Sequence, residues 1–252
     1  MQPPRFRTAV LTAVTLIIVI TCIRLGFWQL DRLHGRKDAN AAIAAAEASP
    51  PRAVPALLAG TNEPTSLRFH PALATGIYDP AHEVLLYGRS SVEGEPGDQV
   101  LTPLRLPDGT ALVVDRGWIP IDQGVPVTGE AAAPTGTVTV AGVLFPPDAL
   151  TVPTGTASPV ERITKVDLGQ IGAQLPYPIL PIYLLLQTQQ PPQQGSLPEP
   201  PPLPPLTNGP HLSYAFQWFS FATIAIVGCI VLLRGDRRDE VAAVAPHRGE
   251  EI

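Results

Sequence analysis

The sequence predicts an α+β membrane protein in which two antiparallel transmembrane helices flank an extracytoplasmic β-rich domain, with antiparallel strands in a sheet or barrel-like arrangement. Two long apolar runs, one near each end of the chain, predict the helices. Between them, short segments of strand-forming residues are separated by glycine, proline and aspartate, a pattern typical of antiparallel strands joined by turns. The chain of 252 residues is long enough for one such domain and two membrane helices.

The first apolar run covers residues 8–30, and Arg24 is its only charged residue. A helix of this length crosses the hydrocarbon core of a bilayer. Arg24 lies close enough to the predicted outer boundary to extend its guanidinium group toward water. A cleaved signal peptide is the alternative, because Arg5 and Arg7 precede the run and small residues at 44–46 follow it. The length of the run favours a retained membrane anchor.

The second apolar run, residues 212–233, contains no charged side chain. As a helix it would rise about 33 Å, enough to span a bilayer core. Arg234, Arg237 and Arg238 follow it, so the positive-inside rule predicts a cytoplasmic C-terminus in the cell membrane. With two spans, the N-terminus is then cytoplasmic as well. The segment 38–210 has seven basic and sixteen acidic residues, in agreement with a translocated domain.

These patterns divide the chain into seven parts. We predict a cytoplasmic N-terminus (1–7), a first membrane helix (8–30), its helical extension (31–48), the β-rich domain (49–190), a proline-rich linker (191–210), a second membrane helix (211–233) and a cytoplasmic tail (234–252). The extension should end at about Ala48, because Ser49 and two prolines follow it. The proline-rich linker has nine prolines in twenty residues and should be extended.

Within the β-rich domain, turn residues separate the predicted strands. The strands are expected at 67–78, 83–90, 98–106, 110–119, 137–145, 163–166 and 179–188. The sequence LPDGT at 106–110 predicts a hairpin between two of them. A short helix is expected at 167–175, with Asp167 as its N-cap.

The composition excludes several functional classes. A net charge of −5 gives no basic surface for nucleic acid. Cys22 and Cys229 both lie in the apolar runs and Met1 is the only methionine, so the β-rich domain has no sulfur ligand for a metal. His70 and His82 have no ligand-type neighbours at metal spacing. No nucleophile elbow or phosphate-binding loop occurs, and we therefore expect a protein that is not an enzyme.

His211 stands at the start of the second predicted helix, with Tyr214, Trp218 and Phe221 three, seven and ten residues further on. On a helix this spacing places the four side chains on one face. A neutral imidazole at the membrane boundary could ligate the metal of a flat apolar cofactor. The alternative is an interfacial anchor of the kind that aromatic residues provide. In the first helix Arg24, Gly26, Phe27 and Trp28 could face this site, with Gly26 permitting close approach of the helices and Arg24 meeting an anionic group.

The sequence DRGWIP at 115–120 is the most distinctive motif of the β-rich domain. Arg116 could be presented to an anionic group or to a carboxylate of a partner. The alternative is a structural corner, in which Arg116 pairs with Asp115 or another carboxylate and Trp118 packs in the core. Arg89, at the end of a neighbouring predicted strand, has the same two interpretations.

Five motifs resemble those of the Surfeit locus protein 1 family, in the same order along the chain. They are LGFWQLDR at 25–32, LVVDRGWIP at 112–120, VTVAGVL at 138–144, TKVDL at 164–168 and HLSYAFQWF at 211–219. The proline-rich linker and the two-helix plan are most similar to actinobacterial members. Pro146 and Pro147 depart from the arginine-rich sequence that often follows the third motif.

The resemblance implies a role in the assembly of haem-copper cytochrome c oxidase, in which family members help to place haem a in subunit I. Oxidase subunit I or its assembly intermediates would be the partner, and enzymes of haem a synthesis are further candidate partners. His211 would be the axial ligand of the haem iron. The surrounding site would be formed by Trp28, Arg32, Tyr214, Gln217 and Trp218, with Arg24 beside it. Arg116, Gly117 and Trp118 would have a structural or partner-binding role. A structural interaction protein that steadies an oxidase subunit without binding haem is the alternative.

Overall fold

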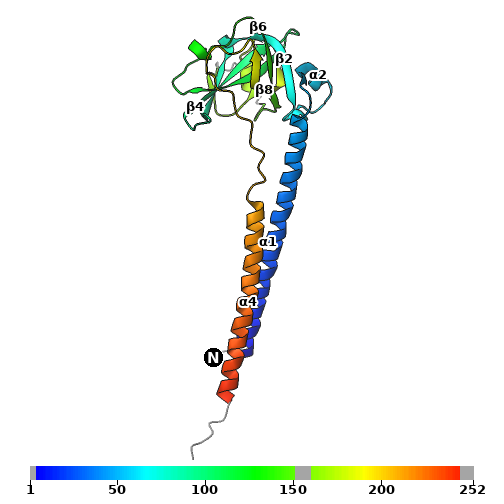
Figure 1. The fold of residues 1–252 in the computed structure, drawn as a ribbon, viewed down its shortest axis with the longest axis vertical. Coiled ribbons are helices and arrows are strands. Elements are labelled where there is room, and N and C mark those ends of the chain that lie inside the picture. The colour runs from blue at the N-terminus through cyan, green and yellow to red at the C-terminus, as the bar shows by residue number, and fades with distance from the viewer. Residues whose placement is uncertain (1–3, 151–159, 245–252) are drawn as a thin grey trace, which may run out of the picture. The chain divides into compact units, whose positions relative to one another are not determined.

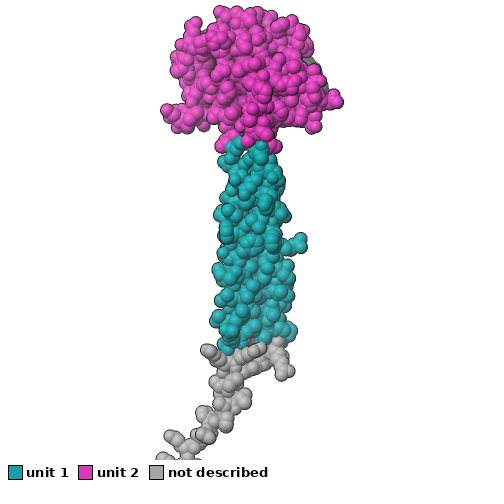
Figure 2. Space-filling model, turned by 45° about the vertical axis from the view of Figure 1, so that its right-hand side comes forward, with its two compact units in different colours: residues 1–41, 206–252 teal, residues 42–205 magenta. Residues whose placement is uncertain are grey.

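The computed structural model describes residues 4–150 and 160–244, and these form two compact units (Figure 2). The first unit contains Met1–Ala41 and Leu206–Ile252, and the second contains Ala42–Pro205. The first unit is helical and corresponds to the two apolar runs. The second holds every strand found in the described residues.

In the first unit, helix α1 (Pro4–Glu47) and helix α4 (His211–Val244) lie side by side (Figure 1). They are antiparallel, because residues later in α1 contact residues earlier in α4 or just before it. Asn40 is hydrogen-bonded to Asn208 just before α4, and Gly26 lies against Phe219 deeper in the pair. Two proline-free apolar sequences without strong helix breakers thus form long helices, as the sequence predicts.

The face where the two helices meet is here called the seam. On α1 it consists of Val19, Cys22, Gly26, Gln29 and Leu33, and on α4 of His211, Ala215, Trp218, Ala222 and Ala225, all buried or half-buried. The spacing alternates between three and four residues on both helices, which is the 3.5-residue period of a two-helix coiled coil. Small residues dominate the seam on α4, so the two backbones approach closely.

Outside the seam both helices expose apolar side chains. The segments Thr8–Glu47 and His211–Gly235 are long and apolar enough to cross a membrane, and only 17% and 6% of their most apolar windows are buried. The core helix of a soluble protein would be mostly buried. The exposed apolar surface is therefore compatible with two membrane spans.

The second unit is built on one eight-stranded sheet with the order β1-β2-β6-β8-β5-β4-β3-β7. Its strands are β1 (Arg52–Ala53), β2 (Pro71–Tyr78), β3 (Val84–Ser90), β4 (Pro96–Arg105), β5 (Ala111–Pro120), β6 (Thr137–Phe145), β7 (Arg162–Ile163) and β8 (Ile179–Gln190). The short helices α2 (Val54–Ala59) and α3 (Leu168–Ala173), with 3₁₀ turns at Pro64–Leu67, Pro80–His82 and Gly129–Ala131, complete it. The largest core cluster gathers residues from β2, β4, β5, β6 and β8 together with Val54 and Leu57 of α2.

The prediction of an antiparallel sheet is wrong in one respect, because the sheet is mixed. The hairpin of β4 and β5 is antiparallel as predicted, and its turn is closed by a 2.8 Å bond from the Leu106 amide to the Thr110 carbonyl. However, β1 with β2, β3 with β7 and β5 with β8 are parallel pairs. Strands joined by a tight turn must be antiparallel, whereas β5 and β8 are joined through β6, β7 and α3, which leaves their direction free.

Strand β2 also pairs with β4 at Ile77 and Tyr78, in addition to its full-length pairing with β6. In addition to its neighbours β1 and β6 in the sheet order, β2 is therefore hydrogen-bonded to β4. At this point β2 and β4 approach so closely that a side chain on Gly76 would overlap the carbonyl of Arg105.

The predicted N-cap of the short helix is confirmed. The Asp167 carboxylate accepts hydrogen bonds from the amides of Gly169 (3.0 Å) and Gln170 (3.3 Å), which satisfies two of the free donors at the start of α3. The helix ends at Ala173, two residues earlier than predicted. Helix α2 was not predicted, since it has only six residues and includes Pro55 near its start.

Much of the proline-rich linker lies on the second unit. The amide and carbonyl of Glu199 pair with those of Trp118, at 2.9 and 2.8 Å, and the Gln187 side chain donates to the Pro201 carbonyl. Leu197 and Leu203 pack against buried clusters of the sheet. The segment contacts the end of β5 that carries the DRGW motif, through Trp118 and Glu199.

Candidate functional site

His211 is the first residue of α4 and is half-buried in the seam. Its Nδ1 atom lies 2.8 Å from the Oε1 atom of Gln29, a seam residue of α1. On the other side of the ring, a Cβ atom on Gly209 would lie 3.3 Å from Nε2. The imidazole is therefore held by one nitrogen, and its second nitrogen faces a residue that has no side chain.

The helix α4 brings the predicted aromatic residues onto one side of His211. Trp218 is half-buried and packs with the buried residues of the seam near Cys22, and its ring meets that of Phe221 edge-on at 5.9 Å. Tyr214 is 47% exposed and Phe221 43% exposed. At 100° per residue, Tyr214, Gln217 and Phe221 lie along one stripe beside the seam, because Gln217 follows Tyr214 by three residues and precedes Phe221 by four. Gln217 is exposed, as Tyr214 and Phe221 are. Aromatic side chains thus lie in and beside the seam, C-terminal to His211 on α4.

Of the α1 residues expected at this site, the structure places some in or beside the seam and turns others away from it. Gly26 is in the seam as predicted, because a Cβ atom there would lie only 2.6 Å from the Phe219 ring. Phe27 meets the same ring edge-on at 5.6 Å. Arg24 and Trp28 are exposed, and helical spacing turns both away from the seam. The Arg32 guanidinium group lies 5.7 Å from the Trp28 ring, a cation–π pair one helical turn apart.

Gln29 is the residue of this site that sequence reasoning missed. It belongs to the LGFWQLDR motif and stands three residues after Gly26, at seam spacing. A polar residue on the close-packed face of an apolar helix is the signal that could have identified it. Its partner could not be read from the sequence, because His211 lies 182 residues away.

The donors at this site fit a metal held by a single imidazole. Among the residues described by the structure, no three His, Cys, Asp or Glu side chains gather to hold a metal ion. A haem supplies four of its own nitrogen ligands and needs only one or two from the protein, so one histidine with exposed aromatic neighbours fits it. His211 would ligate the iron, Tyr214, Trp218 and Phe221 would contact the apolar macrocycle, and Arg32 is the cation nearest in sequence to Gln29 that could pair with a propionate.

In the second unit, Arg116 is enclosed in the core, and its side chain is 1% exposed. Its Nη1 atom lies 3.2 Å from a carboxylate oxygen of Glu83, and its Nη2 atom donates to the carbonyl of Ala131 (2.8 Å) and to the side chain of Gln193 (3.1 Å). The guanidinium group also lies 5.4 Å from the Tyr78 ring. Arg116 therefore pairs with another carboxylate than Asp115, as the structural interpretation allowed.

Glu83 is the centre of this buried network. Besides Arg116, its carboxylate accepts hydrogen bonds from the Thr102 hydroxyl and the Val127 amide, both at 2.8 Å. Burial raises the pKa of Glu83 and lowers the pKa of Arg116, since removal from water disfavours the charged form of each. The two charges thus depend on each other. Both side chains are almost wholly enclosed, and Arg116 is one of the residues that line a cavity of about 270 Å³.

Asp115, the neighbour of Arg116, points to the other side of the strand. It is buried, and its carboxylate accepts a 3.1 Å hydrogen bond from the Gly117 amide. Burial raises the pKa of Asp115 to about 7, although this hydrogen bond and the charge of Arg89 both act in the opposite direction. Arg89 therefore interacts with a carboxylate of its own domain.

Gly117 and Trp118 hold the proline-rich linker. Gly117 has φ +123°, and a side chain there would overlap the Glu199 carbonyl. Trp118 is half-buried and packs over Gly97, so it lies at the border of the core instead of within it. Both residues have structural contacts in this conformation.

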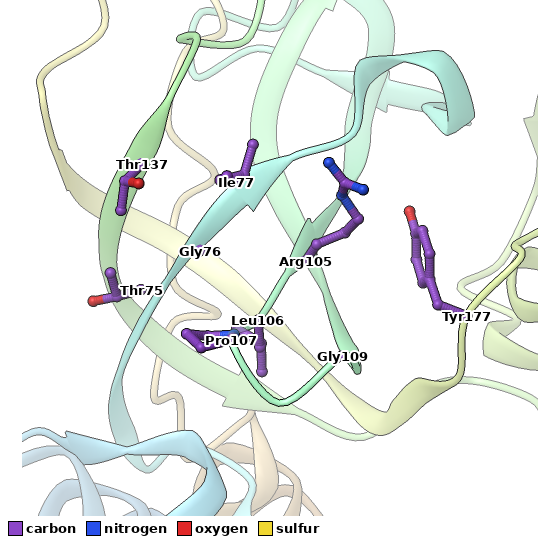
Figure 3. A pocket seen from close by; sticks show the side chains of 9 residues that line it. All are labelled: Thr75, Gly76, Ile77, Arg105, Leu106, Pro107, Gly109, Thr137 and Tyr177. Carbon is purple, nitrogen blue, oxygen red and sulfur yellow. The ribbon is translucent and has the colours of Figure 1, made fainter.

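A surface cavity of about 530 Å³ lies at the β4–β5 turn (Figure 3). Its walls combine apolar and polar side chains from four segments, namely Thr75, Gly76, Ile77, Arg105, Leu106, Pro107, Gly109, Thr137 and Tyr177. Ile77, one of its lining residues, is 42% exposed, and the Tyr177 hydroxyl donates a 2.6 Å hydrogen bond to Asp79. The cavity is an additional surface on which the second unit could receive a partner.

Fold and site together define a class of protein: a β-rich domain inserted between two apolar helices, with a single histidine at the head of their seam. The model of the SURF1 family matches residues 16–223, which include every element of both units except the helix ends. The chain belongs to the SURF1 family, as the five motifs predict.

Curated relatives agree with this assignment. The chain is 28% identical over 228 residues to uncharacterized SURF1-like proteins of Mycobacterium bovis and Mycobacterium tuberculosis, an overlap of 88% of this chain and 82% of theirs. It is 25% identical over 249 residues to a SURF1-like protein of Monosiga brevicollis, with 92% of both chains covered. A SURF1-like protein of Rickettsia felis is 36% identical over 106 residues, 42% of this chain and 44% of its own.

Proposed function

We propose that this protein is a membrane-anchored assembly factor for haem-copper cytochrome c oxidase, and that it holds haem a before the haem enters subunit I. The observation that carries the proposal is the placement of His211. It starts an apolar helix, one ring nitrogen is bound to Gln29, and the other has no hydrogen bond among the described residues. Membership of the SURF1 family supports the same process.

The chain's own residues would have distinct roles in holding the haem. His211 would supply the axial imidazole, and the exposed rings of Tyr214 and Phe221 would cover one side of the macrocycle. Bilayer lipid would cover apolar surface that the two helices leave exposed. Since a carrier must release its cargo, we expect moderate affinity, with a Kd on the order of micromolar.

The proposal also includes a position in the cell membrane. Both termini would be cytoplasmic and the β-rich domain would lie outside, because Arg234, Arg237 and Arg238 follow the second span. Haem would then be held at the outer side of the membrane, near the head of the seam. Labelling of single cysteines placed at exposed Tyr87 and exposed Arg234 by a membrane-impermeant reagent tests this topology.

The haem proposal is tested with detergent-purified full-length protein made in cells that synthesise haem a. The wild type should show a Soret band, and His211→Ala should lack it. His34→Ala is the matched control, because His34 is an exposed histidine on α1 outside the seam. Equal haem content in the His211 variant and the wild type would refute ligation by His211.

A structural interaction protein is the second candidate, and the cavity at Ile77 and Arg105 favours it. In that case the β-rich domain would bind an oxidase subunit and no haem would be held at any stage. This function would be supported over the first by two results together. The protein should still associate with subunit I in His211→Ala but not in Ile77→Glu, and neither the variants nor the wild type should show a Soret band.

A further inference from the structure

We infer that Gln29 is a positioning residue that fixes the tautomer and ring orientation of His211, so that Nε2 is the ring nitrogen that would bind a metal. The inference rests on the proposed function as far as the metal is concerned. Its chemical core, the protonation of one particular ring nitrogen, can be tested without any haem.

The hydrogen bond between the two side chains determines the tautomer. The atom of Gln29 that faces the ring is its amide oxygen, at 2.8 Å from Nδ1. An amide oxygen only accepts, so Nδ1 must carry the proton. In a neutral imidazole the lone pair then resides on Nε2, the form in which histidine ligates metals through that atom.

The position of Gln29 in the seam supports a dedicated role. Its neighbours at seam spacing are Gly26 and Leu33, which bring the helices together without polar groups. A half-buried amide on this face lowers stability unless it is hydrogen-bonded. Within the described residues, the only hydrogen bond of the Gln29 side chain is the one to His211.

Gly209 provides a second and independent observation at the other ring nitrogen. Its φ of +66° is a conformation that residues with side chains rarely adopt. A Cβ atom at this position would lie 3.3 Å from both Nε2 and Cδ2 of His211. The residue that precedes Pro210 thus leaves the approach to Nε2 open, at the nitrogen that the Gln29 bond leaves unprotonated.

The expected chemical effect follows from general properties of metal-bound imidazoles. A hydrogen bond from the distal N–H group fixes the ring and makes the ligating nitrogen a better donor. Loss of such a bond typically lowers metal affinity by about 10- to 100-fold. The acceptor here is a neutral amide, so a carboxylate in its place should strengthen the effect.

The first experiment measures the tautomer in detergent-solubilised, full-length apoprotein labelled with ¹⁵N-histidine. His211 signals are assigned by their loss in His211→Ala. We expect protonated Nδ1 in the wild type and in Asn40→Leu, which removes the hydrogen bond between Asn40 and Asn208 without touching His211. Gln29→Met, similar in shape but with only a weak sulfur acceptor in place of the amide oxygen, should shift His211 toward the Nε2-protonated form. An unchanged His211 spectrum in Gln29→Met would overturn the inference.

The second experiment adds haem a to the same proteins and records affinity and the ferrous iron–histidine stretching frequency. Gln29→Met should bind about 10- to 100-fold more weakly with a lowered frequency. Gln29→Glu should restore binding with a raised frequency, and Asn40→Leu should match the wild type. Equal losses in Gln29→Met and Gln29→Glu would mean that Gln29 has only a packing role, against the inference. Absence of haem binding by the wild type would refute the proposed function, whereas the tautomer measurement would still decide the inference.

Discussion

The buried pair of Arg116 and Glu83 leads to a quantitative prediction about the stability of the β-rich domain. The perturbation is Arg116→Leu, which keeps much of the apolar stem and removes the guanidinium group. Glu83 would keep its hydrogen bonds from Thr102 and Val127 but would lose its countercharge. The carbonyl of Ala131 would lose a 2.8 Å donor as well.

The magnitude follows from the enclosure of both groups, whose side chains are 1% and 0% exposed. Removal of one member of a buried ion pair costs about 3–5 kcal/mol, because the remaining charge is uncompensated. A whole domain is stable by only about 5–15 kcal/mol, so the variant should be marginally folded. Burial already raises the pKa of Glu83 above its unfolded value, and loss of Arg116 should raise it further. The loss of stability should therefore be larger at pH 8 than at pH 5, where protonation relieves the unpaired charge.

The assay is hydrogen–deuterium exchange of the full-length protein in detergent, at increasing urea and at two pH values. Peptides from β4 and β5 report the free energy of opening of the network. Arg52→Leu is the matched control, since Arg52 is exposed on β1, and it should change stability by less than about 0.5 kcal/mol. The double variant Arg116→Leu/Glu83→Leu should lose less than the sum of the single variants. A loss below about 1 kcal/mol in Arg116→Leu, or additive losses in the double variant, would refute the reasoning.

Three further predictions concern close approaches and a buried acid. Gly26→Ala should separate the seam and increase exchange in α4, whereas Gly35→Ala, with open space around it, should leave α4 unchanged. Gly117→Ala should increase exchange around Glu199, because the side chain overlaps that carbonyl, and unchanged protection there would contradict the close contact. The raised pKa of Asp115 means that the folded state binds a proton more tightly than the unfolded state, so stability should fall as pH rises from 3.8 to about 7. Asp115→Asn should flatten this fall, which amounts to about 4 kcal/mol at roughly 1.4 kcal/mol per unit, and an unchanged urea midpoint profile against pH would count against it.

Local features of the fold could be predicted from the sequence because their causes are local. The turn at 106–110 and the N-cap at Asp167 depend on residues within a few positions of one another. The bounds of β6, Thr137–Phe145, agree with the prediction because strand and turn residues alternate sharply there. These elements require no knowledge of what they pack against.

Partners that are distant in the sequence could not be predicted. The parallel pairing of β5 with β8 joins strands separated by a long connection, and nothing in the alternation of β8 specifies its neighbour. Arg116 was expected to meet a carboxylate, but its choice of Glu83 depends on the register of three strands. The same limit applies to Gln29, because its contact with His211 depends on the register of α1 against α4.

Two polar pairs of this protein, Arg116 with Glu83 and His211 with Gln29, differ in how fully their hydrogen-bonding atoms are satisfied. In the buried pair, every side-chain nitrogen and oxygen of Arg116 and Glu83 except Nε of Arg116 is hydrogen-bonded within the core, so a ligand would have to displace existing bonds at high cost. His211 and Gln29 share a single bond at the half-exposed head of the seam, and this bond leaves one nitrogen with its lone pair available. A purely structural pair in that position would gain nothing from the open approach that Gly209 provides. Arg116 of the DRGWIP motif therefore stabilises the domain, and Gln29 of the LGFWQLDR motif is the better candidate for a direct part in function.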